Sequence, residues 1–236
     1  MTRRQDAPSR TPEGREGDAE TIIAAALGLG VALTKEQSGG LLTYVAELQK
    51  WNCTYNLTAL RDHHQILVNH LFDCLSVIAP MRAFLATPAH AAPKIVDVGS
   101  GAGLPGVVIA LANPGWDVYC VDSVEKKTAF VRQIGAVLGL RGLKAIHGRI
   151  EALPPFEADL VVSRAFASLP DFAILAGGHV GAGGCLLAMK GKAPEEPLSV
   201  PTPAGAWQID RVQPLTVPGL AAQRCLVWMR HHRGTP

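Results

Sequence analysis

The sequence predicts an α/β fold: a mostly parallel sheet of seven strands with helices on both faces, preceded by a helical extension. Three observations predict this fold class. Short apolar runs alternate with helical patterns from Lys94 to Lys190, as in strands joined by crossover helices. The first run ends in a glycine-rich turn, which is typical of a strand that passes into a helix. The last two runs follow one another without a helix, which indicates an antiparallel hairpin at one sheet edge.

Length and composition are those of a globular protein with ample material for a core. The chain has 236 residues, of which 48% are hydrophobic and 18% charged, enough for one large domain or one domain with an extension. Its net charge of +2 does not by itself indicate a nucleic-acid partner. The five cysteines show no C-x-x-C spacing, and no secretory signal or membrane span is evident. We therefore expect a cytoplasmic protein with reduced thiols.

The chain divides into three segments. Residues 1–18 are polar with nearly balanced charges, and we expect a disordered, solvated tail there rather than an arm that touches RNA. Residues 19–93 form the predicted helical extension, which ends in an Ala/Pro-rich linker over 87–93. Residues 94–236 form the predicted sheet domain.

Apolar residues at helical spacing predict three helices in the extension. The first starts near Ala19. The second follows a capping box made by Thr34 and Gln37, and it is expected to end near Trp51. Asp62 is placed to N-cap the third helix.

The stretch between the second and third helices, Trp51–Thr58, has no helical periodicity and is predicted to be a structured loop. Its aromatic and amide side chains, Tyr55 and Asn56, are of the kind that stack on a base and read its edge. The alternative is that Trp51 and Tyr55 simply cover the end of the helical layer.

His70 and Asp73 lie three residues apart in the third predicted helix and so share one face of it. They are candidates for a pair that faces a pocket. A purely structural role for the histidine is an equally good interpretation of the sequence.

The stretch from Lys94 to Gly106 is the centre of the predicted site. A buried strand ends near Asp97, and glycines at 101, 103 and 106 then match the pattern G-x-G-x-x-G. Glycine serves where the backbone takes a positive φ or comes close to a ligand. Pro105 suits the first turn of a helix over 107–112, whose N-terminus presents free N–H groups.

The kind of ligand at this turn is suggested by two acids. Asp122 ends the second strand roughly 20 residues after the turn, where a carboxylate can bind ribose hydroxyls. Turn and acid together indicate a cofactor that contains adenosine. Asp97 suits the cationic amino-acid end of S-adenosylmethionine better than the pyrophosphate of a dinucleotide. An ordinary glycine-rich turn beside an exposed acid is the remaining alternative.

The other predicted elements follow in order. Helices are expected at 125–138 and, with Ser168 as N-cap, at 168–176. The strands after the first are expected at 117–122, 143–147, 159–163, 185–190, 206–212 and 223–231.

The carboxyl ends of parallel strands meet at one edge of a sheet, which is where ligands bind. Arg149, Arg164 and Lys190 follow three of these ends, and they would suit the phosphates of a nucleic-acid substrate. Each of them could instead be solvated, or paired with a neighbour such as Glu151.

Taken together, these motifs resemble the class I S-adenosylmethionine-dependent methyltransferases. More narrowly, they are similar to the bacterial glucose-inhibited division protein B family, which methylates the N7 atom of a guanine in small-subunit 16S rRNA. The resemblance runs from about Ala19 to the C-terminus, and family members often have proline where this chain has Ala102. The residues that carry it are Trp51–Thr58, His70–Asp73, Asp97–Gly106, Asp122–Ser123, Ser163–Ser168 and Lys190–Gly191.

The resemblance implies a Rossmann-like methyltransferase fold, S-adenosylmethionine as the cofactor and no metal. In the family pattern Asp122 matches the ribose-binding acid, Ile150 and Glu151 flank the adenine, and Gly99 and Leu104 belong to the cofactor turn. The cofactor-binding set expected here is Asp97, Gly99, Gly101, Gly103, Leu104, Asp122, Ser123, Ile150, Glu151 and Arg164. The RNA-binding candidates are Tyr55, Asn56, Arg149, Arg164 and Lys190.

The methyl transfer that this resemblance implies requires few catalytic groups from the protein. Guanine N7 has a lone pair and no proton to lose, so no general base is needed, and alignment of nitrogen, methyl and sulfur can supply much of the catalysis. Acids near the pocket could stabilise the cationic product. No residue is assigned as catalytic, and the candidates by position are Asn56, His70 and Asp73.

Two other classes of function fit the sequence less well. A nicotinamide-dependent oxidoreductase shares the turn and the ribose acid, but none of the three tyrosines has a lysine four residues later. A non-catalytic RNA-binding module would not need the cofactor turn. We therefore expect a monomeric enzyme that acts on 16S rRNA within the small ribosomal subunit or its assembly intermediate, without a membrane.

Overall fold

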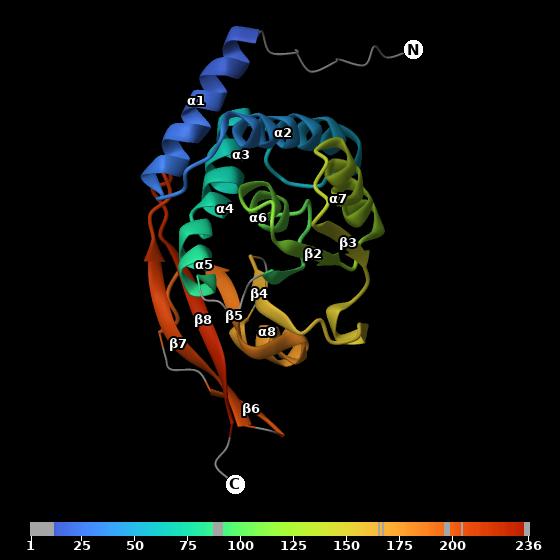
Figure 1. Cartoon of the computed structure of the whole chain (residues 1–236), viewed down its shortest axis with the longest axis vertical. Helices are drawn as coiled ribbons and strands as arrows, with labels where there is room; N and C mark the ends of the chain where they lie inside the picture. The colour runs from blue at the N-terminus through green and yellow to red at the C-terminus, as the bar shows by residue number, and fades with distance from the viewer. Residues whose placement is uncertain are drawn as a thin grey trace.

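The computed structural model describes residues 12–86, 92–164, 166, 168–195, 199–203 and 205–233. Its centre is an eight-stranded sheet in the order β3-β2-β1-β4-β5-β8-β7-β6 (Figure 1). Strands β1 to β5 run parallel, and β6, β7 and β8 add antiparallel pairs at one side. The bounds are β1 Lys94–Val98, β2 Asp117–Asp122, β3 Leu143–His147, β4 Ala158–Ser163, β5 Val180–Lys190, β6 Ser199–Thr202, β7 Gly205–Leu215 and β8 Arg224–Arg233.

The predicted α/β fold with a C-terminal antiparallel hairpin is confirmed, but the sheet has one strand more than the seven expected. The additional strand is β6, which pairs with β7 over the four residues Ser199–Thr202. It is short and contains Pro201, which cannot donate to a strand neighbour, so it lacks the usual strand pattern.

The register of the parallel strands brings the predicted strand ends to one edge. Asp97 of β1 lies beside Cys120 of β2, and Asp122 of β2 lies beside His147 of β3. On the other side of β1, Ser163 ends β4 just before Arg164. The side chains that follow these strands therefore meet along one rim of the sheet, as parallel topology requires.

Helices cover both faces of the sheet (Figure 1). Alternate strand residues face one core with α2, α6 and α7 and a second core with α8, which is the period-two pattern of buried strands. The α-helices are α1 Pro12–Gly28, α2 Lys35–Tyr55, α3 His63–Ile66, α4 Asp73–Leu75, α5 Ile78–Leu85, α6 Gly106–Ala112, α7 Glu125–Val137 and α8 Leu169–Ala176. A π-helical segment η1 spans Leu67–Phe72, and 3₁₀ turns are η3 Ile150–Ala152 and η4 Gly177–His179.

The first helix begins earlier than expected. It starts at Pro12 rather than near Ala19, so the later part of the predicted disordered tail is helical. Proline is tolerated in the first turn of a helix, and the Glu and Arg residues that follow favour helix, although the segment is polar. Residues 1–11, for which disorder was predicted, and most of the predicted linker, residues 87–91, lie outside the described residues.

The predicted loop at Trp51–Thr58 is wrong over its first half, because α2 continues to Tyr55. Asn52 is buried within the helix, where its side chain receives the Thr58 N–H and donates to the Leu60 carbonyl. The helix ends where Asn56 adopts a left-handed conformation, with φ at 50°. Polar residues that look like a loop in sequence thus close the helix and fold the chain back against it.

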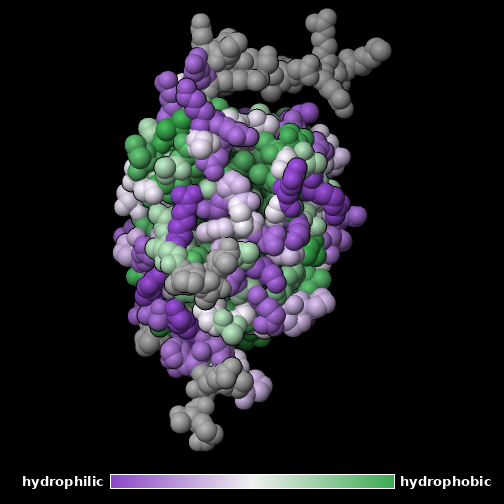
Figure 2. Space-filling model, viewed as in Figure 1, coloured by the Kyte–Doolittle hydropathy of each residue, from purple (hydrophilic) through white to green (hydrophobic). Residues whose placement is uncertain are grey.

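The helical run His63–Leu85 is apolar enough, by composition and length, to cross a membrane. However, 67% of its most apolar window is buried inside the protein. Its hydropathy is accounted for by packing in the first core, beside residues from α2 and the sheet. Hydrophilic and hydrophobic side chains are mixed over the face seen in Figure 2.

Candidate functional site

The glycine-rich turn between β1 and α6 has the conformation that its sequence predicts. Gly99 and Gly101 have φ of 68° and 57°, and a Cβ atom at either position would meet nothing within 4 Å. The Gly99 and Ser100 N–H groups donate to the Val121 carbonyl of β2, at 2.9 and 3.1 Å. The turn is therefore fixed to the second strand while the space beside two of its glycines stays open.

Asp97 lies below this turn and is fully buried. Its Oδ2 accepts the Gly106 N–H at 2.7 Å, so it ties β1 to the start of α6. Its Oδ1 has no hydrogen-bond partner within the described part of the chain. Burial raises the pKa of Asp97 to about 7, although the Gly106 N–H and the Arg164 charge act in the opposite direction.

Gly106 is required by the same contact. A Cβ atom there would lie 2.3 Å from Cys120 Sγ and 2.9 Å from Asp97 Oδ2. Any larger residue would push the start of α6 away from β1 and β2. This glycine of the G-x-G-x-x-G pattern thus serves close packing between helix and strand.

Asp122 lies at the end of β2, with 6% of its surface exposed. Its Oδ2 accepts the Gly101 N–H and its Oδ1 accepts the Val124 N–H, each at 2.8 Å. Lys127 Nζ is 3.9 Å from Oδ2. An ionised carboxylate has about four acceptor positions, so Asp122 can still accept further hydrogen bonds.

The residues present fit S-adenosylmethionine. Open space beside Gly99 and Gly101, a carboxylate at the end of β2 and a buried carboxylate oxygen without a partner are what a cationic adenosine cofactor needs. Two members of the predicted set face inward instead. A Cβ on Gly103 would clash with Val107, and the Leu104 side chain is buried in the core, so these two can offer only backbone.

The predicted adenine side lies next to Asp122. The Asp122 carbonyl accepts the Gly148 N–H, and η3 with Ile150 and Glu151 follows directly. The Ile150 carbonyl accepts a 2.9 Å hydrogen bond from Nε2 of buried His179, which the sequence did not single out. Ser123 is exposed, and its carbonyl lies 3.1 Å from His147 Nε2.

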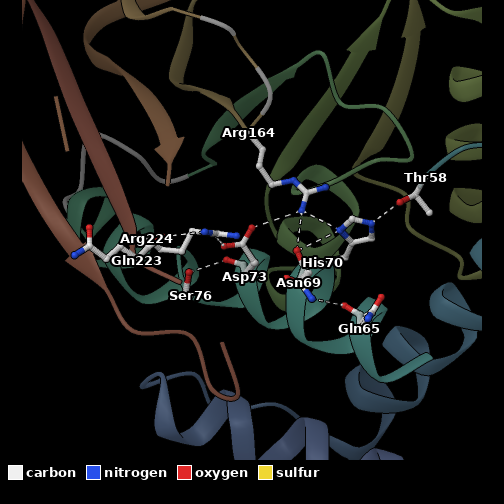
Figure 3. Close-up of polar contacts among 9 residues, drawn as sticks. All are labelled: Thr58, Gln65, Asn69, His70, Asp73, Ser76, Arg164, Gln223 and Arg224. Atoms are coloured by element: carbon white, nitrogen blue, oxygen red, sulfur yellow. Dashed lines mark hydrogen bonds and ion pairs between the residues drawn. The ribbon is translucent and has the colours of Figure 1, made fainter. Parts of the chain in front are cut away.

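A second group of side chains meets around Arg164, just past the end of β4 (Figure 3). Arg164 Nη1 lies 3.5 Å from Asp73 Oδ2 and donates to the Asn69 carbonyl at 3.2 Å. On the other side of Asp73, Arg224 Nε donates to Oδ1 at 3.0 Å. Asp73 is thus a buried carboxylate between two guanidinium groups, and it links α4, the end of β4 and β8.

His70 belongs to the same group. Its Nδ1 lies 3.2 Å from Arg164 Nη1, and its Nε2 lies 2.7 Å from Thr58 Oγ1. Nδ1 is also 3.2 Å from the Asn69 carbonyl, but arginine can only donate, so we assign Nδ1 as the acceptor and Nε2–H as the donor to Thr58. Burial and the Arg164 charge lower the pKa of His70 to about 4, so the ring is neutral at neutral pH.

The structure therefore brings the predicted pair of His70 and Asp73 together with Arg164. The π-helical segment η1 supplies this geometry, because it carries His70 and ends where Asp73 begins the next turn. Asn56 is not part of the group: its Oδ1 accepts a hydrogen bond from Arg61 at 2.6 Å.

The remaining RNA-binding candidates differ in their surroundings. Tyr55 is 43% exposed and packs against Trp51, with ring centroids 5.1 Å apart. Arg149 is exposed and lies 3.6 Å from Glu151. Lys190 is half-buried, and its ammonium group donates to the Phe166 carbonyl at 2.7 Å.

Sequence reasoning missed Thr58, Arg224 and Tyr44 as members of the site. Thr58 ends the predicted loop, where nothing in the sequence indicates a partner for its hydroxyl, and Arg224 is only the first residue of the last strand, β8. Tyr44 looks like an ordinary core residue of an amphipathic helix, although its hydroxyl donates to the Ala102 carbonyl of the turn.

A cavity of about 570 Å³ lies elsewhere, near the start of β5. It is lined by Glu157, Trp207, Arg230, His231 and a glycine-rich backbone, and its described lining includes none of the predicted site residues. Among the described residues, no cluster of three or more His, Cys, Asp or Glu side chains could hold a metal ion.

Comparison with known proteins supports one family. A family model described as rRNA small subunit methyltransferase G matches residues 37–227. The protein of that name from Bordetella pertussis is 52% identical over 227 residues, covering 96% of this chain and 99% of the relative. Its counterpart from Bordetella avium is 54% identical over 217 residues, covering 92% and 95%. Among solved structures, a SAM-dependent methyltransferase from Aquifex aeolicus is 14% identical with a TM-score of 0.48, covering 70% of this chain and 92% of that one.

Proposed function

The chain belongs to the rRNA small subunit methyltransferase G family, and from this premise we propose that the turn after β1 holds the S-adenosylmethionine whose methyl group it transfers. The enzyme methylates the N7 atom of a guanosine in 16S rRNA of the small ribosomal subunit. One observation carries the assignment of the site. The buried Asp97, the open glycine turn and the strand-end Asp122 are joined by direct hydrogen bonds into a single cradle.

Within this cradle the residues have separate roles. Asp122 accepts hydrogen bonds from the ribose hydroxyls, since its two oxygens keep lone pairs after binding Gly101 and Val124. Ile150 and Glu151 flank the adenine from η3. Asp97 lies beneath the glycines, and its charge favours the cationic amino-acid end of the cofactor.

The chain's contribution to catalysis is alignment. The sulfonium of the bound cofactor supplies an activated methyl group with a good leaving group. Guanine N7 attacks with a lone pair and has no proton to lose, so the protein needs no general base. Holding the base in line with that methyl group can lower the barrier by several kcal/mol, about 7 or more in well-aligned systems.

Arg164 and its partners define where the base sits. Asp73 is engaged with two arginines, and His70 is neutral with both ring nitrogens in use. These two residues therefore orient Arg164 and do not transfer protons. The Arg164 side chain is 24% exposed, so a phosphate or a base edge can approach it at the rim.

Exposed groups around this rim form the RNA side of the proposal. Tyr55 offers an accessible ring to a base, and Arg149 offers an exposed guanidinium to phosphate. Asn56, which follows α2, and Lys190, which ends β5, complete the set of residues proposed to contact RNA. The enzyme acts as a monomer in the cytoplasm, on rRNA inside the small subunit or its assembly intermediate. Residues 94–236 carry the cofactor, and the preceding helices pack against them.

Mass spectrometry of the RNA tests this function. Purified small subunits that lack the modification, protein-free 16S rRNA and free guanosine are each incubated with enzyme and isotopically labelled S-adenosylmethionine. Labelled 7-methylguanosine at a single position, formed far faster in subunits, is the expected result. Efficient labelling of free guanosine would refute the substrate assignment, and equal labelling of protein-free rRNA would refute the requirement for an assembled subunit.

A further inference from the structure

Tyr44 connects the helical extension to the cofactor turn. It lies on α2, is 1% exposed, and donates its hydroxyl hydrogen to the Ala102 carbonyl at 2.9 Å. The two residues are 58 positions apart in the chain. Because α2 packs against α6 and α7, it brings this hydroxyl to the turn from the helical layer.

The turn is otherwise held by the sheet. Val121 and Asp122 of β2 accept the N–H groups of Gly99, Ser100 and Gly101. The far end of the turn is closed by bonds from Gly103 and Leu104 to the Ser100 carbonyl. Among the described residues, the Ala102 carbonyl at the crest receives its side-chain donor from Tyr44. A buried carbonyl without a donor costs about 1–3 kcal/mol, so this bond favours the observed conformation of the turn by about that amount.

The phenol is itself held rigidly and stays protonated. Its ring packs at a tilt on Phe130, with centroids 6.1 Å apart, and Phe130 packs edge-on against Trp51 at 5.4 Å. Burial raises the pKa of Tyr44 well above its usual range, so the hydroxyl remains a hydrogen-bond donor at any working pH.

We propose that Tyr44 is a positioning residue for the cofactor: its hydroxyl holds Ala102 so that the space beside Gly99 and Gly101 stays open, and the helical extension thereby completes the cofactor site. This inference rests on the proposed function, because it takes S-adenosylmethionine as the ligand of the turn. Tyr44 does not touch the reacting atoms, and its effect reaches them through the turn alone.

The Tyr44→Phe variant removes the hydroxyl and keeps the ring. We expect the dissociation constant for S-adenosylhomocysteine, measured by calorimetry, to rise roughly tenfold, because the turn then samples closed conformations. KM for S-adenosylmethionine should rise by a similar factor with kcat within about twofold of the wild type. A merely structural role would lower the free energy of unfolding but leave the affinity of the folded protein unchanged.

Two controls make the result specific. Tyr119→Phe removes a hydroxyl on β2 that contacts Lys144, away from the turn, and should leave the affinity unchanged. Phe130→Leu keeps the Tyr44 hydroxyl and alters the aromatic packing around it, so it should retain most of the affinity.

Unchanged affinity in folded Tyr44→Phe would overturn the inference, and so would an equal loss in Phe130→Leu, which would assign the effect to packing. If the wild-type protein itself fails to bind S-adenosylhomocysteine, the proposed function fails instead.

Discussion

Asp97 is the residue whose environment is least expected for a charged group. It is fully buried, one of its oxygens has no partner in the described part of the chain, and Asp122 is a like charge nearby. Burying a carboxylate without full pairing is costly, and the raised pKa of about 7 expresses that cost. Such a group is tolerated where a cationic ligand later compensates it, which agrees with its place under the cofactor turn.

The stability of the ligand-free protein should consequently depend on pH through Asp97. Its pKa is about 7 in the folded state and about 3.8 in the unfolded chain, so the folded state binds the extra proton between these values. The contribution of Asp97 to the free energy of unfolding should therefore fall as pH rises from 4 to 7. In Asp97→Asn this fall should be missing, as urea denaturation between pH 5 and pH 8 can measure.

His70 acts in the opposite direction, since its lowered pKa of about 4 makes stability rise with pH between about 4 and 6.5. It is present in both proteins, so the difference between the wild type and Asp97→Asn isolates Asp97. A difference that is constant from pH 5 to pH 8 would contradict the buried, partly protonated carboxylate.

Asp122 gives a second prediction at this scale. Asp122→Ala removes the oxygens that we propose bind the ribose and also the acceptor for the Gly101 N–H, so affinity for S-adenosylmethionine should fall at least about a hundredfold. Asp117→Ala, at the other end of β2, is a matched control that should bind normally. Isothermal titration calorimetry measures the affinity of both variants for S-adenosylmethionine. Unchanged affinity of Asp122→Ala would refute the ribose assignment.

Residues could be predicted where their chemistry is local in the sequence. The glycines, Asp97 and Asp122 follow apolar strands at characteristic spacing, and the structure joins them by direct hydrogen bonds. Arg224 and Tyr44 act on residues far along the chain, at separations of 151 and 58 positions. Only the tertiary fold decides which carbonyl or carboxylate they reach, so no local pattern could single them out.

At the scale of elements, η1 is the feature that shapes the rim. It lies between α3 and α4 in one continuous helical run, and its wider turn carries Asn69 and His70 to the Arg164 side chain. Asp73 begins the next α-helical turn and reaches both Arg164 and Arg224 (Figure 3). The Asp73 carboxylate thus joins three elements: α4, the end of β4 and β8.

Asp73→Asn should therefore destabilise the protein. It leaves two neighbouring guanidinium groups without their shared counter-charge, which we expect to lower the free energy of unfolding by about 2 kcal/mol or more. The exposed pair of Asp210 and Arg230, 3.8 Å apart, gives the control, since Asp210→Asn should cost less than about 1 kcal/mol. Urea denaturation of both variants measures these free energies of unfolding. Equal decreases in the two variants would show that the buried ion pairs of Asp73 are no stronger than a surface pair.

Strands and most helices could be predicted because burial sets their periodicity. The five parallel strands begin and end close to the predicted positions, apart from an early start of β5, and the capping box of Thr34 and Gln37 is present as expected. The end of α2 could not be predicted, because buried Asn52 finds its partners only after the chain folds back. The π-helical turn has no local sequence signal either.

At the scale of the whole molecule, the extension and the sheet share one core. Ile22, Leu41 and Leu48 of the extension belong to the same buried cluster as Ile109, Phe130 and Leu160. Neither part can bury its apolar face without the other. We expect urea unfolding followed by Trp fluorescence and by circular dichroism to give coincident transitions, as for one cooperative unit. Separate transitions would indicate that the helices fold independently of the sheet.

The central claim is that the rim above β1 and β2 holds the methyl donor and presents it toward Arg164. A crystal structure with S-adenosylmethionine bound tests it most directly. The ribose hydroxyls should lie within hydrogen-bond distance of Asp122, the cofactor should occupy the space beside Gly99 and Gly101, and its methyl group should face the rim around Arg164. A cofactor bound instead in the cavity near the start of β5, or one that leaves Asp122 untouched, would contradict the claim.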